Sequence, residues 1–193
     1  MKPCHFVLIA LLLSFLPAPL LPQNNSPNLK LVAHLDPLPH LTGDRASFSE
    51  VTGAGDLAIL GGFQDFFVWI YDLSDRSKPE LLATIPLNST AYDVQVHGRY
   101  LFIALGNAME WYDILNPRQP RLVKHFAPQP GIIPHTFFVA GNTLYIADYG
   151  VSPAKISIFD ITDKKNPRRL SEIRDPVWTI HDMTVIRKRL YGA

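Results

Sequence analysis

The sequence predicts an all-β protein assembled from repeated units of four short strands. The chain has 17 prolines and 11 glycines among its 193 residues, which leaves little room for long helices. One phrase recurs along the chain, as YDLSDRSKPELL, YDILNPRQPRLV and FDITDKKNPRRL. Between these phrases lie short segments rich in Val, Ile, Phe and Tyr and bounded by turn residues, which is the pattern of β-strands.

The recurring phrase predicts a turn followed by an outer strand. In each copy an aspartate is followed by Asp or Asn three residues later and by a proline seven residues later. These residues are Asp72 with Pro79, Asp113 with Pro120, and Asp160 with Pro167. The carboxylate can accept hydrogen bonds from backbone amides two or three residues on, and the proline suits the start of a strand at an outer edge. We expect structural turns here, because a calcium loop needs several carboxylates close together.

The spacing of the strand-like segments predicts the architecture. In the third copy four strands are expected at residues 135–140, 143–148, 155–160 and 169–174. Repeats of about 40–50 residues with four strands each are typical of a β-propeller of antiparallel blades. Complete blades are therefore expected at about residues 45–90, 91–134 and 135–180, and a partial fourth blade at 181–193.

Three third strands carry a family resemblance. They read VWIYDL at 68–73, MEWYDI at 109–114 and ISIFDI at 156–161, and the chain also contains the pattern HDMTV…RLYGA. Together with the Asp-to-Pro turn, these segments resemble the LVIVD-repeat proteins over roughly residues 29–193, although none of the strands spells LVIVD itself. The resemblance implies a propeller, usually an exported one, and names no activity.

A stretch near the N-terminus predicts a closing strand. Leu29–Leu35 precedes an Asp-Pro pair and a histidine, as the segment beginning at Asn166 does. In closed propellers an outer strand of this kind completes the last blade, so its partners are expected at the C-terminus. Only two further strands are expected after His181, and we therefore expect the chain to be a fragment of a longer propeller. A four-bladed miniature and a truncated product without function are the alternatives.

The N-terminus predicts export. Lys2 precedes the apolar run Phe6–Leu16, which is too short for a bilayer span of about 20 residues but suits the core of a signal peptide. We expect a signal peptide at residues 1–22, with an uncleaved anchor as the alternative. The mature part is then expected to have no transmembrane span and to be secreted, periplasmic or at the cell surface. It keeps no cysteine, because the chain's single cysteine is Cys4.

Two histidines are the leading candidates for a site. His135 and His181 open the innermost strands of their units, and the matching positions in the earlier units are expected to be Tyr92 and Ser47. Equivalent positions in neighbouring blades line one mouth of the central channel, so the two imidazoles are expected to face each other.

Carboxylates accompany the histidines. Asp93 and Asp182 lie one residue beyond the matched positions, and Glu50 lies nearby in the first unit. Two imidazoles with carboxylates could hold Zn²⁺ or another divalent metal ion. The alternative is that His135 and His181 cap the inner strands and hydrogen-bond across blades. Nothing else in the sequence indicates a cofactor.

The remaining features favour a binding role. With 18 basic and 17 acidic residues, the net charge of +1 gives no field that would draw the protein to nucleic acid. The sequence contains no nucleophile elbow, glycine-rich phosphate loop or His-Glu-x-x-His motif. We expect a non-catalytic binding or scaffold module for a protein or small-molecule ligand. A metal-assisted hydrolase or oxidoreductase acting through His135 and His181 is the alternative.

Overall fold

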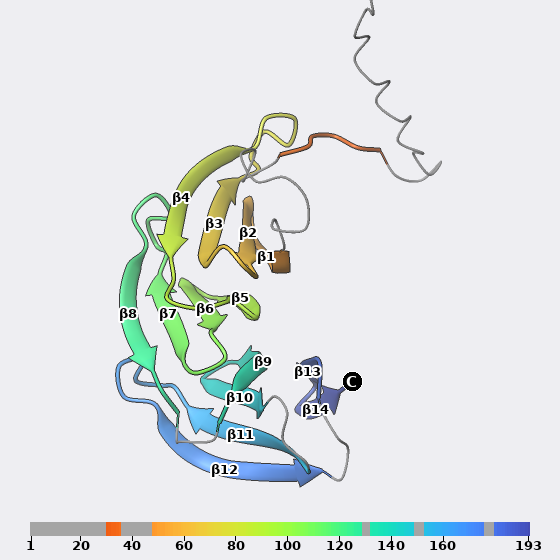
Figure 1. Ribbon diagram of the computed structural model, residues 1–193, viewed down its shortest axis with the longest axis vertical. Coiled ribbons are helices and arrows are strands. Elements are labelled where there is room, and N and C mark those ends of the chain that lie inside the picture. Colours follow the sequence, from red (N-terminus) through yellow and green to blue (C-terminus); the bar gives the residue numbers. More distant parts are fainter. Residues whose placement is uncertain (1–29, 36–47, 129–131, 149–152, 176–179) are drawn as a thin grey trace, which may run out of the picture. The chain divides into compact units, whose positions relative to one another are not determined.

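The structure is all-β throughout the residues that it describes. The computed structural model describes residues 30–35, 48–128, 132–148, 153–175 and 180–193. Across these ranges the chain forms three four-stranded antiparallel sheets and one two-stranded sheet, and no helix (Figure 1). The predicted all-β class and its four-stranded units are therefore confirmed.

In every sheet, strands that are consecutive in the sequence are neighbours. The first sheet consists of β1 (Phe48–Ala54), β2 (Leu57–Gly62), β3 (Phe67–Asp72) and β4 (Glu80–Pro86). The second consists of β5 (Asp93–His97), β6 (Tyr100–Ala104), β7 (Met109–Asp113) and β8 (Arg121–Phe126). The third consists of β9 (Pro134–Ala140), β10 (Thr143–Asp148), β11 (Ala154–Asp160) and β12 (Arg168–Asp175). The last holds β13 (Met183–Ile186) and β14 (Arg189–Gly192).

A two-residue hairpin turn joins the first two strands of each sheet. Such turns match the twist of the strands best when their residues adopt positive φ, which glycine does without strain. Gly55, Gly98 and Gly141 stand first in their turns with φ of 60°, 61° and 61°. In the last sheet Arg187 and Lys188 adopt φ of 48° and 65°. Counting from these turns gives a common register for all four sheets.

The recurring aspartates close the turns between the third and fourth strands. Asp72 accepts a hydrogen bond from the Ser74 amide at 2.8 Å, and Asp113 and Asp160 accept equivalent bonds from the amides two residues on at 3.0 and 2.9 Å. These bonds lower the pKa of each carboxyl, and with the Thr162 hydroxyl they bring the pKa of Asp160 to about 2. The prolines at 79, 120 and 167 stand directly before β4, β8 and β12.

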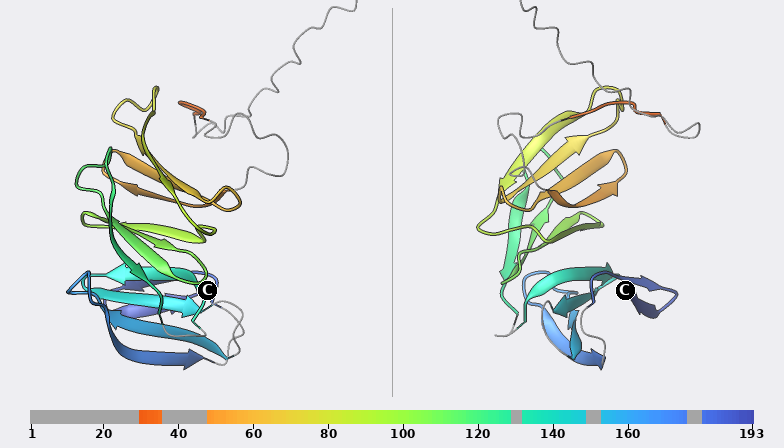
Figure 2. Two further views of the ribbon diagram at one scale, coloured as in Figure 1. Left: turned by 60° about the vertical axis from the view of Figure 1, so that its left-hand side comes forward. Right: turned by 45° about the vertical axis from the view of Figure 1, so that its right-hand side comes forward.

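Apolar side chains fill the spaces between neighbouring sheets. Ile59 and Ile70 of the first sheet pack against Leu101 and Ile103 of the second, and all four are fully buried. Figure 2 shows the second sheet lying between the first and the third. Its other face packs against the third sheet through Trp111, Phe102 and their neighbours.

The inner strands of successive sheets contact one another. β1 contacts β5, β5 contacts β9, and β9 contacts β13. A smaller apolar cluster, which includes Ile156, Ile180 and Met183, joins the third sheet to the β13–β14 hairpin. Each fully buried aliphatic side chain contributes roughly 1.5–3 kcal/mol, so packing between sheets is a main source of stability.

The closing strand expected at Leu29–Leu35 stays a prediction. Within the predicted strand Leu29–Leu35, the described residues 30–35 have no strand structure and pair with no sheet. Ala33 and Leu35 instead lie against the first sheet, in a groove of about 210 Å³. The predicted signal peptide at residues 1–22 lies outside the described residues, and no helix of the described chain is long and apolar enough to cross a membrane.

Trp111 provides a test of packing between sheets. It is fully buried, and its indole Nε1 donates a hydrogen bond to the carbonyl oxygen of Lys164 in the third sheet at 2.8 Å. Trp111→Ala is expected to lower the free energy of unfolding by about 3–5 kcal/mol, measured by urea denaturation. Trp111→Phe keeps an aromatic ring and should cost clearly less. Leu115→Ala, at a position 69% exposed, should change stability by no more than about 0.5 kcal/mol. A loss below about 1 kcal/mol for Trp111→Ala would contradict this account of the packing.

Candidate functional site

Two layers of side chains meet at one end of the inner strands. The residues that stand six positions before the hairpin turns form the histidine layer, which consists of Ser49, Tyr92, His135 and His181. The next residue of each strand belongs to the carboxylate layer, which consists of Glu50, Asp93, Thr136 and Asp182. These eight residues line a single pocket of about 230 Å³. Four separate sheets therefore contribute equivalent positions to one site.

The register of the hairpin turns corrects one expected position. Counting back from Gly55 places Ser49, and not Ser47, level with His135 and His181. Ser47 lies outside the described residues. Alignment by the apolar stretch alone misses this shift, because Val51 stands four positions before Gly55, whereas Val96 stands two positions before Gly98.

The two histidines contact each other. His135 Nε2 lies 3.2 Å from His181 Nδ1, and the rings stack with centroids 5.3 Å apart at an angle of 23°. One nitrogen must donate and the other accept, so this contact needs at least one neutral imidazole. Burial lowers the pKa of His135, and the neighbouring His181 lowers it further. Tyr92 packs edge-on against His135 with ring centroids 5.4 Å apart.

Asp93 joins the second sheet to the third. Its Oδ2 accepts hydrogen bonds from the Phe137 amide at 2.9 Å and from the Thr136 hydroxyl at 3.0 Å. Two residues further along β5, Gln95 Oε1 accepts from the Val139 amide at 2.9 Å. These side chains of β5 satisfy amides on the free edge of β9. Because β9 is an edge strand, its outward amides would otherwise need water or another partner.

The environment of Asp93 favours its protonated form. Burial, together with the nearby carboxylates of Glu50 and Asp182, raises the pKa of Asp93 to about 6, although the hydrogen bonds from Phe137 and Thr136 oppose the shift. A carboxyl with such a pKa titrates close to neutral pH and holds its proton more readily than a solvated aspartate does.

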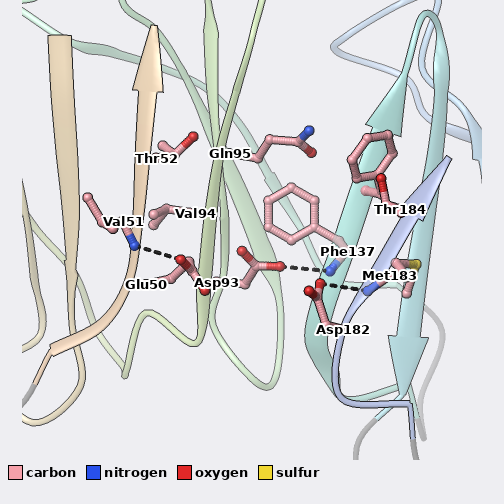
Figure 3. A pocket seen from close by; sticks show the side chains of 11 residues that line it. Glu50, Val51, Thr52, Asp93, Val94, Gln95, Phe137, Asp182, Met183 and Thr184 are labelled. Carbon is pink, nitrogen blue, oxygen red and sulfur yellow. Dashed lines mark hydrogen bonds between the residues drawn. The ribbon is translucent and has the colours of Figure 1, made fainter. Parts of the chain in front are cut away.

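The other two carboxylates are held by local bonds. Glu50 Oε1 accepts from the Val51 amide at 2.9 Å, and Asp182 Oδ1 accepts from the Met183 amide at 2.6 Å. Figure 3 shows Glu50, Asp93 and Asp182 side by side on three sheets, with Asp93 directed toward Phe137. A second pocket of about 290 Å³ continues from these carboxylates along the inner strands to the level of Gln95 and Thr184.

The structure places the four predicted site residues around one pocket. His135, His181, Asp93 and Asp182 all line it. Yet the described residues include no group of three or more His, Cys, Asp or Glu side chains that could hold a metal ion. The two histidines bond to each other, and Asp93 bonds to β9.

Sequence reasoning missed two residues of the site. Thr136 belongs to the carboxylate layer, and Gln95 fastens β9 to β5. Counting from Gly98 and Gly141 would have found both positions, because the turns set the register. The sequence does not show that their side chains reach the neighbouring sheet.

These observations define a class of protein. Repeated four-stranded antiparallel sheets, packed face to face with their first strands innermost, are blades of the β-propeller type. Residues 89–127 match the family described as LVIVD repeat, a range that includes all four strands of the second sheet. The resemblance found in the sequence is confirmed for this segment. No curated protein matches the chain.

The raised pKa of Asp93 predicts a pH-dependent contribution to stability. Because the folded pKa is about 6 and the unfolded value is about 3.9, the folded state binds more protons between these values. The contribution of Asp93 is therefore fully present below pH 4 and is lost as the pH rises through 6.

Comparison with Asp93→Asn isolates this effect. As the pH rises from 4 to 7, the free energy of unfolding of the wild type should fall by on the order of 2 kcal/mol relative to that of the variant. Urea denaturation at each pH measures this difference. His135 contributes with the opposite sign, since its lowered pKa costs stability below pH 6.5, but this contribution cancels in the comparison. Parallel pH profiles for the two proteins would show that Asp93 has an ordinary pKa.

Proposed function

We propose that the protein is an exported, non-catalytic binding module of the β-propeller type, and that its ligand binds in the pocket lined by the histidine and carboxylate layers. The observation that carries this proposal is the convergence of eight side chains from four sheets on one pocket of about 230 Å³. Binding sites are commonly formed where a rigid scaffold presents side chains at its ends. A pocket of this size suits a small molecule or a single side chain of a protein ligand.

The chemistry of the pocket favours a ligand group that donates hydrogen bonds and carries positive charge. Glu50, Asp93 and Asp182 supply acceptor oxygens from three sheets. The Tyr92 ring and the stacked histidines provide an aromatic wall beside them. Carboxylates beside aromatic rings complement ammonium and guanidinium groups, because both the negative charge and the ring faces attract a cation.

Export is supported by the N-terminal sequence alone. Lys2 and the apolar run Phe6–Leu16 have the composition and length of a signal peptide. We propose that the binding module acts outside the cytoplasm, where a mature chain without cysteine has no thiol to oxidise.

A titration with matched probes tests the binding function. Agmatine, a small dication, is expected to shift the imidazole NMR signals of His135 and His181, whereas glutarate, a small dianion, is not. In the double variant Glu50→Gln with Asp182→Asn the agmatine affinity should fall about tenfold or more, because two charges that attract the ligand are removed. The variant Glu80→Gln, at an exposed position on β4, is the control for removing a carboxylate outside the pocket. Equal agmatine affinity in the wild type and the double variant, or binding of glutarate alone, would show that this pocket is not the site.

A further inference from the structure

A third layer of polar side chains lies beyond the carboxylates along the inner strands. Each of its members stands two residues after a member of the carboxylate layer, and this neutral layer consists of Thr52, Gln95 and Thr184. Side chains two residues apart lie on the same face of a strand. The neutral layer and the carboxylates therefore line one pocket of about 290 Å³. Figure 3 shows the neutral layer at one end of this pocket and the carboxylates at the other.

Gln95 contributes hydrogen-bond donors to the neutral layer. Its Oε1 accepts from the Val139 amide at 2.9 Å. Because a backbone amide can only donate, this bond fixes which end of the Gln95 side chain faces β9 and leaves its Nε2 for another partner. Nε2 has two N–H donors, and within the described part of the chain it bonds to no group. Gln95 is half-buried, so these donors are open to a ligand.

The two threonines complete the neutral layer. Thr52 and Thr184 are half-buried on β1 and β13, and among the residues that the structure describes their hydroxyls have no hydrogen-bond partner. Each hydroxyl can donate or accept. Phe138 stands at the matching position of the third sheet and gives the layer an apolar side. The layer thus offers donors and adaptable hydroxyls, but no charge.

A neutral primary amide matches this layer better than a charged group does. Its carbonyl oxygen can accept from Gln95 Nε2, and its own N–H groups can donate to the threonine hydroxyls. A second ammonium group would face the Gln95 donors, and a carboxylate would be repelled by the neighbouring carboxylate layer. Two residues along β5 separate Asp93 from Gln95, which corresponds to about 6–7 Å.

We propose that the ligand is a small linear molecule with a cationic amine at the carboxylate layer and a neutral amide about 7 Å further along, at the neutral layer. This inference rests on the proposed function, because the amine is the cation for which the carboxylates of the pocket supply acceptors. Gln95 is the specificity-determining residue of the second subsite, since its Nε2 can only donate.

The test compares three amines of equal chain length in NMR titrations of the full chain. 5-Aminopentanamide ends in a primary amide, hexylamine in a methyl group and cadaverine in a second ammonium group. The imidazole signals of His135 and His181 report occupancy of the pocket. The wild type is expected to bind 5-aminopentanamide about fivefold or more tightly than hexylamine, because only the amide forms hydrogen bonds with the neutral layer.

Gln95→Glu tests the second subsite directly. The variant keeps an acceptor for the Val139 amide and replaces the Nε2 donors by an acceptor oxygen. It should abolish the preference for 5-aminopentanamide over hexylamine and raise the affinity for cadaverine about fivefold or more. Thr52→Val combined with Thr184→Val should bring the affinities for 5-aminopentanamide and hexylamine closer together, because it removes both hydroxyls. Thr84→Val, at an exposed position on β4, is the matched control and should keep the wild-type preference.

The outcomes separate this inference from the proposed function. Equal affinities of the wild type for 5-aminopentanamide and hexylamine would overturn the second subsite, while binding of both amines would still support the pocket as a cation site. A preference for the amide that persists in Gln95→Glu would also overturn the role of Gln95. If none of the three amines binds, the proposed function and this inference are both wrong.

Discussion

Every sheet of this protein has apolar side chains on both of its faces, and the need to bury both faces is the constraint on which the rest of the structure depends. The second sheet meets it fully, with Leu101 and Ile103 against the first sheet and Phe102 and Trp111 against the third. A sheet of this kind cannot be stable alone in water. Stacking of repeats is therefore the condition for folding, as in other repeat proteins.

The stacking also creates the site. Since all sheets have the same register, their inner strands bring equivalent positions to the same level, and the two layers around the pocket result from this alignment. The polar bonds of Asp93 and Gln95 to the amides of β9 then fix the spacing between two inner strands. His135 and His181 form a corresponding contact between the third sheet and the β13–β14 hairpin. The residues that line the pocket are thus also the residues that join the sheets, which ties its geometry to the stability of the stack.

Much of the fold could be predicted because it depends on local patterns. The aspartate turns, the prolines before the outer strands and the alternation of apolar residues are repeated in the sequence, and each has a local physical cause. The site was predictable in part: His135, His181, Asp93 and Asp182 follow from position within the repeat. Contacts between sheets were not, because they depend on how side chains reach across: the Thr136 hydroxyl donates to Asp93 of the second sheet, and Gln95 accepts from the Val139 amide of the third. Whether the segment Leu29–Leu35 forms a strand depends likewise on a partner edge that the segment itself does not encode.

The most direct test of this account is hydrogen exchange at the amides of Phe137 and Val139, which lie on the free edge of β9 and donate hydrogen bonds to side chains of β5. We predict that both amides exchange slowly in the wild type. We also predict that Asp93→Ala speeds exchange at Phe137 by about a hundredfold or more, while the amide of Ile146 inside the third sheet is unchanged. If Phe137 and Val139 exchange in the wild type as fast as exposed amides of an edge strand, the inner strands are not joined in this way, and the account of the site is wrong.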